Sequence, residues 1–335
     1  RYTYRFMEDG SPERAAFQWY HDHRMDVTGR NVWMGLAGMS IIDDTFDRGL
    51  PLPRGRFDVP LMVVDREFDS DNQIPYTFDS EGPVTDHLLT NGAAEPYFNV
   101  ADRKYRFRLL NASNVGIWTF TLSNEQEMVQ IATDSGLLPA PVPRTEILLG
   151  PAERAEVVID FAGHLGEKIV LGTTTAGDVV EFRVTRDREE TSTIPSELRP
   201  VPAFGPPDET RVWELGEIPD PQRGVIWTIN GNTFDPERVD AYPELGSTER
   251  WVFVNKSSSP HVMHIHDVDW LLQSRNGRAP AAYEAGLKES FFISAPGVLE
   301  MTSRFTDHVG RYVFHCHLLE HEDQSMMAQF EVVDS

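Results

Sequence analysis

The sequence predicts an all-β fold of Greek-key β-sandwiches, because short segments of alternating apolar and polar residues recur along it. Turns rich in Gly, Pro, Asn and Asp separate these segments, and helical periodicity is scarce. The alternating segments lie at residues 104–110, 155–161, 250–255, 310–314 and 327–333. Each is expected to form one strand of a sandwich.

Length and proline content divide the chain into units. A chain of 335 residues accommodates about two to three domains. Seven prolines gather in an acidic stretch at residues 194–221, which predicts a connector at 196–208. We expect a middle sandwich at residues 43–195 and a C-terminal sandwich at 209–335. Residues 1–42 are too few to bury a core, so they are expected to be the end of an incomplete first domain.

Composition excludes several classes of function. The formal charge of -23 and the isoelectric point near 4.8 argue against nucleic-acid binding, which requires a basic surface. The same charge disfavours anionic membrane surfaces. No apolar run reaches the ~20 residues of a membrane-spanning helix. A single cysteine also excludes a disulfide within the chain.

One segment near the end of the sequence combines a thiol, imidazoles and a thioether. These are His315, Cys316, His317, His321 and Met326. Thiolate, imidazole and a weak thioether together suit a copper electron-transfer site. The alternative is a buried structural cysteine among core histidines, since free cysteine often behaves as a small hydrophobic residue.

Strand geometry gives this spacing a meaning. Successive side chains of a β-strand point to opposite faces, so His315 and His317 share one face and Cys316 lies on the other. One strand could therefore serve two metal centres. The run at residues 259–266 repeats this pattern: its pair at 264 and 266 shares a face, and its histidine at 261 has the opposite parity. A third same-face pair consists of His21 and His23.

These motifs resemble those of multicopper oxidases, and they are most similar to bacterial laccases of the spore-coat type, bilirubin oxidases and phenoxazinone synthases. The matching segments lie at residues 19–23, 31–38, 105–113, 261–266 and 315–326, which together span nearly the whole chain. The resemblance implies tandem cupredoxin-like sandwiches. The middle domain is expected to be copper-free, because its two histidines, His87 and His164, stand at unrelated positions.

Carried over residue by residue, the resemblance implies two copper sites. The type 1 copper would be held by His261, Cys316 and His321, with Met326 as its long axial ligand. In the trinuclear cluster His264 would bind the type 2 copper, and the type 3 pair would be bound by His21, His23, His266, His315 and His317. A complete assembly would hold four coppers.

The resemblance also implies a missing piece. The family uses eight histidines for the cluster, and this chain supplies six. Family members carry a further His-x-His motif upstream, and no histidine precedes His21 here. We therefore expect an N-terminal fragment of the same oxidase, cleaved or recorded as a separate chain, to be a partner. If that fragment is absent, the type 1 site could survive but dioxygen reduction should fail.

The implied activity is one-electron oxidation of phenolic, aminophenolic or related substrates, coupled to four-electron reduction of dioxygen to water. Cys316 would pass electrons to the cluster through its two neighbouring histidines. Glu322 is expected to relay protons, although a purely structural hydrogen-bonding role is an alternative. The resemblance further implies a location outside the cytoplasm, as a secreted, periplasmic or spore-coat protein.

Three other classes remain open at this point. A simple type 1 electron-transfer cupredoxin would not need the histidines outside the type 1 site. A copper nitrite reductase would not need three His-x-His pairs. A zinc hydrolase built on His264, His266 and Asp269 lacks a third histidine at the next position, which is Trp270. Intense thiolate-to-copper colour would exclude zinc.

Overall fold

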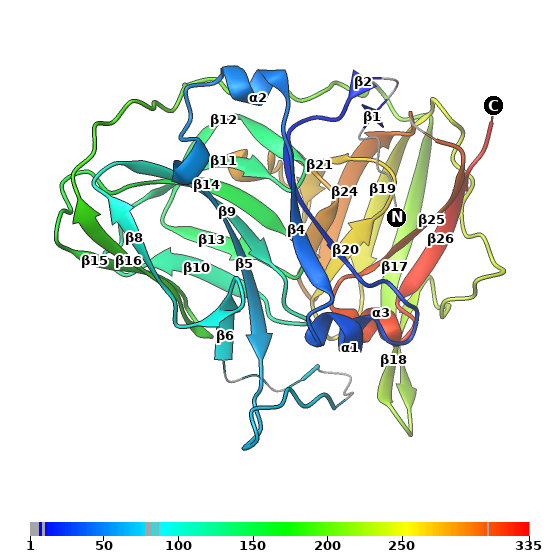
Figure 1. Cartoon of the computed structure of the whole chain (residues 1–335). Helices are drawn as coiled ribbons and strands as arrows, with labels where there is room; N and C mark the ends of the chain where they lie inside the picture. The colour runs from blue at the N-terminus through cyan, green and yellow to red at the C-terminus, as the bar shows by residue number, and fades with distance from the viewer. Residues whose placement is uncertain are drawn as a thin grey trace.

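Two β-sandwiches stand side by side in the computed structural model, and β4 of the N-terminal segment runs between them (Figure 1). The structure describes residues 7–8, 11–77, 82–83, 85, 87–306 and 308–334. The predicted incomplete domain at residues 1–42 therefore lies partly outside the described residues.

The middle sandwich packs a seven-stranded sheet, in the order β12-β11-β14-β9-β5-β6-β7, against a five-stranded sheet, in the order β13-β10-β15-β16-β8. Its core combines aromatic and aliphatic side chains from both sheets, such as Phe107 and Phe182. The strands are β5 (Asp58–Arg66), β6 (His87–Thr90), β7 (Ala93–Ala94), β8 (Tyr97–Ala101), β9 (Lys104–Asn111), β10 (Trp118–Leu122), β11 (Met128–Thr133), β12 (Gly136–Arg144), β13 (Glu146–Leu149), β14 (Arg154–Asp160), β15 (Lys168–Thr173) and β16 (Gly177–Arg186).

The C-terminal sandwich pairs a six-stranded sheet, β18-β17-β19-β24-β21-β22, with a four-stranded sheet, β23-β20-β25-β26. Trp251, Trp270 and Phe314 are among the side chains of its core. Its elements are β17 (Glu209–Asp220), β18 (Gly224–Ile229), β19 (Thr248–Asn255), β20 (His261–Ile265), β21 (Trp270–Arg275), η2 (Ala282–Glu284), β22 (Leu287–Lys288), β23 (Ser290–Ile293), β24 (Gly297–Arg304), β25 (Gly310–Cys316), α3 (Leu319–Asp323) and β26 (Met327–Val332).

The N-terminal segment contributes two small two-stranded sheets and short helices. Its elements are β1 (Met7–Glu8), β2 (Ser11–Pro12), β3 (Ala16–His21), α1 (Thr28–Trp33), β4 (Ala37–Ile42), α2 (Thr45–Gly49) and η1 (Gly55–Phe57). Helix α1 lies beside α3 of the C-terminal sandwich (Figure 1). The carboxylate of Asp323 in α3 accepts hydrogen bonds from the backbone N–H groups of Thr28 (3.0 Å) and Gly29 (2.8 Å). This contact caps α1 and ties it to the sandwich.

The all-β prediction is confirmed, and every alternating segment forms a strand: β9, β14, β19, β25 and β26. The proposed domain limits stay a prediction. Part of the predicted connector packs against the middle sandwich rather than lying free. The backbone N–H of Leu198 donates to Pro139 O (2.8 Å), and the Leu198 side chain is buried beside β12.

A buried ionic cluster covers the face of the seven-stranded sheet that points away from its core. Arg106 Nε donates to Glu156 Oε2 (2.5 Å), and Arg108 Nη1 donates to Glu156 Oε1 (2.7 Å). Asp47 of α2 pairs with Arg106 (3.0 Å), and Asp58 pairs with Arg108 (2.7 Å). The cluster therefore holds the helix α2 and the start of β5 against β9 and β14.

Replacing Glu156 by Gln should lower the free energy of unfolding by about 3–5 kcal/mol, because two buried guanidinium groups lose their shared counter-charge. Urea unfolding of the purified protein measures this. Asp58→Asn is the matched control: the Asp58 side chain is 17% exposed and Arg108 keeps Glu156 as a partner, so the loss of stability should be clearly smaller. Equal losses in the two variants would contradict the account of the cluster.

Candidate metal centres

Three buried side chains converge in the C-terminal sandwich. His261 begins β20, Cys316 ends β25 and His321 lies in α3. The Nδ1 atoms of the two histidines are 3.1 Å apart, and Cys316 Sγ lies 3.4 Å from His261 Nδ1 and 3.7 Å from His321 Nδ1. Two imidazole nitrogens and one sulfur in this arrangement fit a trigonal copper site.

The neighbourhood of this first centre is largely apolar. Met326 is buried, and its backbone is held by both partners: Cys316 N donates to Met326 O (3.0 Å), and Met326 N donates to His321 O (3.0 Å). The Trp227 ring packs 4.2 Å from the His321 ring. Ser257 Oγ lies 2.8 Å from His261 Nε2, which leaves Nδ1 of that histidine to face the centre.

A second centre gathers six imidazoles on the other side of β25. The Nε2 atom of His315 lies 3.1 Å from Nε2 of His23 and 3.3 Å from Nε2 of His266. These three nitrogens form a potential metal-binding group. The other three rings join the same cluster, with ring centroids 5.1 Å apart for His21 and His317 and 5.6 Å apart for His264 and His317.

Backbone carbonyls fix the orientation of several of these rings. His21 Nδ1 lies 2.7 Å from Asp22 O, His264 Nδ1 lies 3.1 Å from Glu289 O, and His315 Nδ1 lies 3.0 Å from Cys316 O. A carbonyl oxygen only accepts hydrogen bonds, so each Nδ1 carries the proton and each Nε2 keeps a lone pair. This arrangement is typical of metal-binding histidines.

His317 differs from these rings. Its Nδ1 atom is buried and has no hydrogen-bond partner among the described residues. Leaving such a nitrogen unsatisfied is costly, and a bound cation would satisfy it. Trp19 packs 5.3 Å from the His317 ring and 4.6 Å from the His21 ring, so the indole holds two members of the cluster in place.

Loss of solvent keeps most of the site histidines neutral, as metal binding requires. Burial lowers the pKa of His261 to about 3 and that of His21 to about 4, although Glu322 partly offsets the latter. Burial likewise lowers the pKa of His264 well below its usual value. Burial raises the pKa of the Cys316 thiol to about 12, so a thiolate at this position requires a bound cation.

Glu322 lies beside the six-imidazole centre. Its buried carboxylate is 3.1 Å from His315 Nδ1 and 3.4 Å from His23 Nδ1. Burial alone would lower the pKa of His315 and raise the pKa of Glu322. The contact between the two groups outweighs burial, so the pKa of His315 is raised and the pKa of Glu322 is held well below its usual range. A cavity of about 300 Å³ adjoins the same centre and is lined by His264, His266 and Asp267, among others.

The structure thus places the three predicted strong type 1 ligands in the first centre, with Met326 next to them. It places the six histidines predicted for the trinuclear cluster in the second centre. Sequence reasoning missed Trp227 and Ser257, and it gave no role to Trp19, which stands in a matching segment. Ser257 stands four residues before His261, so a search for hydroxyl groups close to the ligands could have found it. Trp227 lies on β18, and no local sequence signal links it to His261. Among the described residues, neither candidate group includes a side chain of the middle sandwich.

A sulfur-containing centre next to an imidazole cluster, in a pair of cupredoxin-like sandwiches, defines a copper oxidoreductase. The family model described as "Multicopper oxidase" matches residues 207–335. A laccase of Bacillus stratosphericus is 33% identical to this chain, over 96% of this chain and 72% of the laccase. A bilirubin oxidase of Albifimbria verrucaria is 34% identical, over 95% of this chain and 60% of the relative.

Solved structures agree with these relatives. The crystal structure of a laccase from Pediococcus acidilactici superimposes with a TM-score of 0.90 at 32% identity, covering 97% of this chain and 71% of that chain. The chain belongs to the multicopper oxidase family. It is a laccase-like, copper-dependent oxidoreductase with dioxygen as acceptor, so the predicted fold, enzyme class and cofactor are confirmed. Members of the family bind one type 1, one type 2 and two type 3 coppers. No helix among the described residues is long and apolar enough to cross a membrane.

Proposed function

We propose that the two centres are the type 1 site and the trinuclear site of this oxidase. The type 1 ligands are His261, Cys316, His321 and axial Met326. The trinuclear ligands are His264 for the type 2 copper and His21, His23, His266, His315 and His317 for the type 3 pair. The observation that supports the assignment is the alternation at the end of β25: Cys316 Sγ lies beside His261 and His321, whereas the rings of His315 and of the following His317 lie in the imidazole cluster.

Copper supplies one-electron redox chemistry at the first centre and dioxygen reduction at the second. The protein supplies the connection between them, because Cys316 is bonded through the backbone to both His315 and His317. The hydrogen bond from His315 Nδ1 to Cys316 O (3.0 Å) adds a short second link. Trp227 and the surrounding core exclude water from the sulfur.

Glu322 is proposed to handle protons at the second centre. Its carboxylate contacts Nδ1 of His315 and of His23, the ring atoms that face away from the other imidazoles. A carboxylate there holds these rings in one tautomer and accepts or returns a proton at Nδ1 as dioxygen is consumed. The neighbouring carboxylate of Asp323 does not take this role, because it accepts hydrogen bonds from the first backbone N–H groups of α1.

The proposal also covers the remaining copper ligands, the substrate and the location of the protein. Two further imidazoles, on an N-terminal fragment of the same oxidase outside the described residues, are proposed to complete the cluster. The reducing substrates are proposed to be phenolic, aminophenolic or related compounds, as in the laccase and bilirubin oxidase relatives. We also propose a location outside the cytoplasm, which cell fractionation tests.

Copper counting combined with oxygen uptake tests the assignment. The purified sample, with every polypeptide identified by intact mass, should contain about four coppers per assembly, absorb intensely in the visible, and consume dioxygen with a phenolic substrate. One copper with the same colour and no dioxygen uptake would instead indicate an electron-transfer cupredoxin. A colourless, zinc-loaded protein would contradict both.

A further inference from the structure

The proposed type 2 ligand His264 is oriented by two adjacent residues: Glu289, which separates β22 from β23, and Ser290, which begins β23. Its Nδ1 atom lies 3.1 Å from both Glu289 O and Ser290 Oγ. The strand register pairs His264 with Ser290, and Ile265 N also donates to Glu289 O (3.0 Å). The position of residues 289 and 290 therefore decides where the Nε2 lone pair of His264 points.

Asp134 of the middle sandwich binds the same short segment. This fully buried residue lies in the turn between β11 and β12. Its Oδ2 atom accepts a hydrogen bond from Ser290 N (3.2 Å) and an ion pair from Lys288 Nζ (3.1 Å). Its Oδ1 atom accepts from Arg154 N (2.7 Å). One carboxylate thus joins β14 to the residues on both sides of Glu289.

Arg154 makes a second contact between the middle sandwich and this segment. Its fully buried guanidinium pairs with Glu289 (2.7 Å), donates to Asp134 O (3.1 Å), and donates from Nε to Phe17 O (2.9 Å). Phe17 belongs to β3, the strand that ends at the proposed type 3 ligand His21. The same side chain therefore ties the middle sandwich to β3, which carries a proposed copper ligand, and to the segment that orients another.

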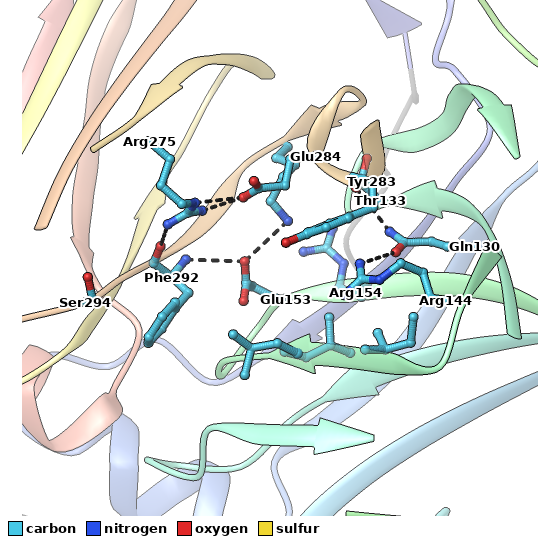
Figure 2. Close-up of a pocket in the computed structure, with 14 residues that line it drawn as sticks. Gln130, Thr133, Arg144, Glu153, Arg154, Arg275, Tyr283, Glu284, Phe292 and Ser294 are labelled. Atoms are coloured by element: carbon cyan, nitrogen blue, oxygen red, sulfur yellow. Dashed lines mark hydrogen bonds and ion pairs between the residues drawn. The ribbon is translucent and has the colours of Figure 1, made fainter. Parts of the chain in front are cut away.

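Glu153 extends these contacts along the interface. Its carboxylate lies 3.4 Å from Lys288 Nζ and accepts from Phe292 N (3.3 Å) of β23, the strand that begins at Ser290 (Figure 2). The residues lie beside a cavity of about 180 Å³ between the two sandwiches. Buried charges are tolerated only when they are fully paired, so these contacts specify one relative position of the segment and the sandwich.

We propose that Asp134 and Arg154 of the middle sandwich are positioning residues for the type 2 copper, acting through Glu289 and Ser290 on His264. The middle sandwich contributes no ligand but sets the ring orientation on which the ligand depends. This inference rests on the proposed assignment of His264. Partners of this kind change metal affinity by about 10- to 100-fold when they are removed.

Asp134→Asn, Arg154→Lys and Ser290→Ala test the inference in the copper-loaded holoenzyme. Each should weaken retention of the type 2 copper about 10- to 100-fold, seen as loss of the type 2 EPR signal during mild dialysis against a chelator. The type 1 absorption should stay at its wild-type intensity. Ser290→Ala removes only one hydroxyl, so it tests the inference even if the two charge variants fold poorly.

Asp58→Asn is the matched control, because it alters an ion pair on the same sheet that makes no contact with the segment at 287–290. It should retain both copper signals. A ¹⁵N NMR measurement on metal-free protein gives a readout independent of copper: Asp134→Asn and Ser290→Ala should reduce the Nδ1-protonated form of His264.

The outcomes separate the inference from the proposed function. If the three variants keep the wild-type type 2 signal and tautomer, the positioning role is wrong and the site assignment stands. If Asp58→Asn loses the type 2 copper equally, the effect is general destabilisation and the inference fails. A wild-type holoenzyme with a type 1 signal but no type 2 signal contradicts the assignment of His264, and the inference falls with it.

Discussion

Replacing Cys316 by Ser should abolish the visible absorption of the copper-loaded protein and lower kcat with a phenolic substrate by at least about 10³-fold, the scale seen when an essential reactive group is removed. Cys316 is the only thiol in the chain, and its sulfur lies within 3.7 Å of both partner nitrogens. A serine hydroxyl has nearly the same size but is a poor ligand for copper. Visible spectroscopy, metal analysis and steady-state oxidation measure the effect.

The copper content should fall by one per assembly while the six-imidazole centre keeps its metal. Met327→Leu is the control, because it is a buried neighbour of Met326 whose replacement conserves volume and leaves the ligands intact. It should keep the colour and most of the activity. A Cys316→Ser protein that remained blue, or that oxidised the substrate normally, would overturn the assignment of the first centre.

Replacing Glu322 by Gln should slow dioxygen reduction by about 10²–10⁴-fold, the usual contribution of a positioned acid or base. The variant keeps the size of the side chain but loses the carboxylate that contacts His315 and His23. Reduction of the type 1 copper by substrate, followed in the absence of oxygen, should proceed at the wild-type rate. Reoxidation by dioxygen should be slow, with an altered pH profile.

Glu320→Gln provides the matched control for this change. Glu320 lies in the same short helix and is equally buried, but its carboxylate accepts hydrogen bonds from Asn114 (2.7 Å) and Tyr76 (3.2 Å) rather than contacting the histidines. Burial raises its pKa to about 7, so a neutral amide should be tolerated. Normal reoxidation of Glu322→Gln at every pH would remove the proton role and leave a structural one.

The parts of the site that could be predicted from the sequence depend on local geometry. Alternation along one strand predicts Cys316 and its neighbouring histidines on opposite faces; in the structure Cys316 ends β25 beside His261 and His321, whereas His315 and the following His317 lie in the imidazole cluster. The same reasoning separated His261 from His264. These predictions needed only the two-residue repeat of an extended chain, so they did not depend on knowing the rest of the fold.

The remainder depends on contacts between distant segments. Trp227 contacts His321 of α3 from β18 of the six-stranded sheet, and Asp134 bonds to Ser290 across 156 residues of sequence. Neither an Asp in a turn nor a Trp in an apolar strand has a local pattern that identifies such a partner. The same limitation applies to Leu198, where proline content suggested a free connector although its side chain and backbone are bound to the middle sandwich.

The five-residue helix α3 presents consecutive side chains to different centres, His321 to the sulfur site and Glu322 to the imidazole cluster. The proposed sites of electron entry and proton delivery therefore share one turn of backbone. A single insertion or deletion within that turn would misalign both at once. Evolutionary tuning of either property must then proceed by changing side chains around the turn, with its length kept constant.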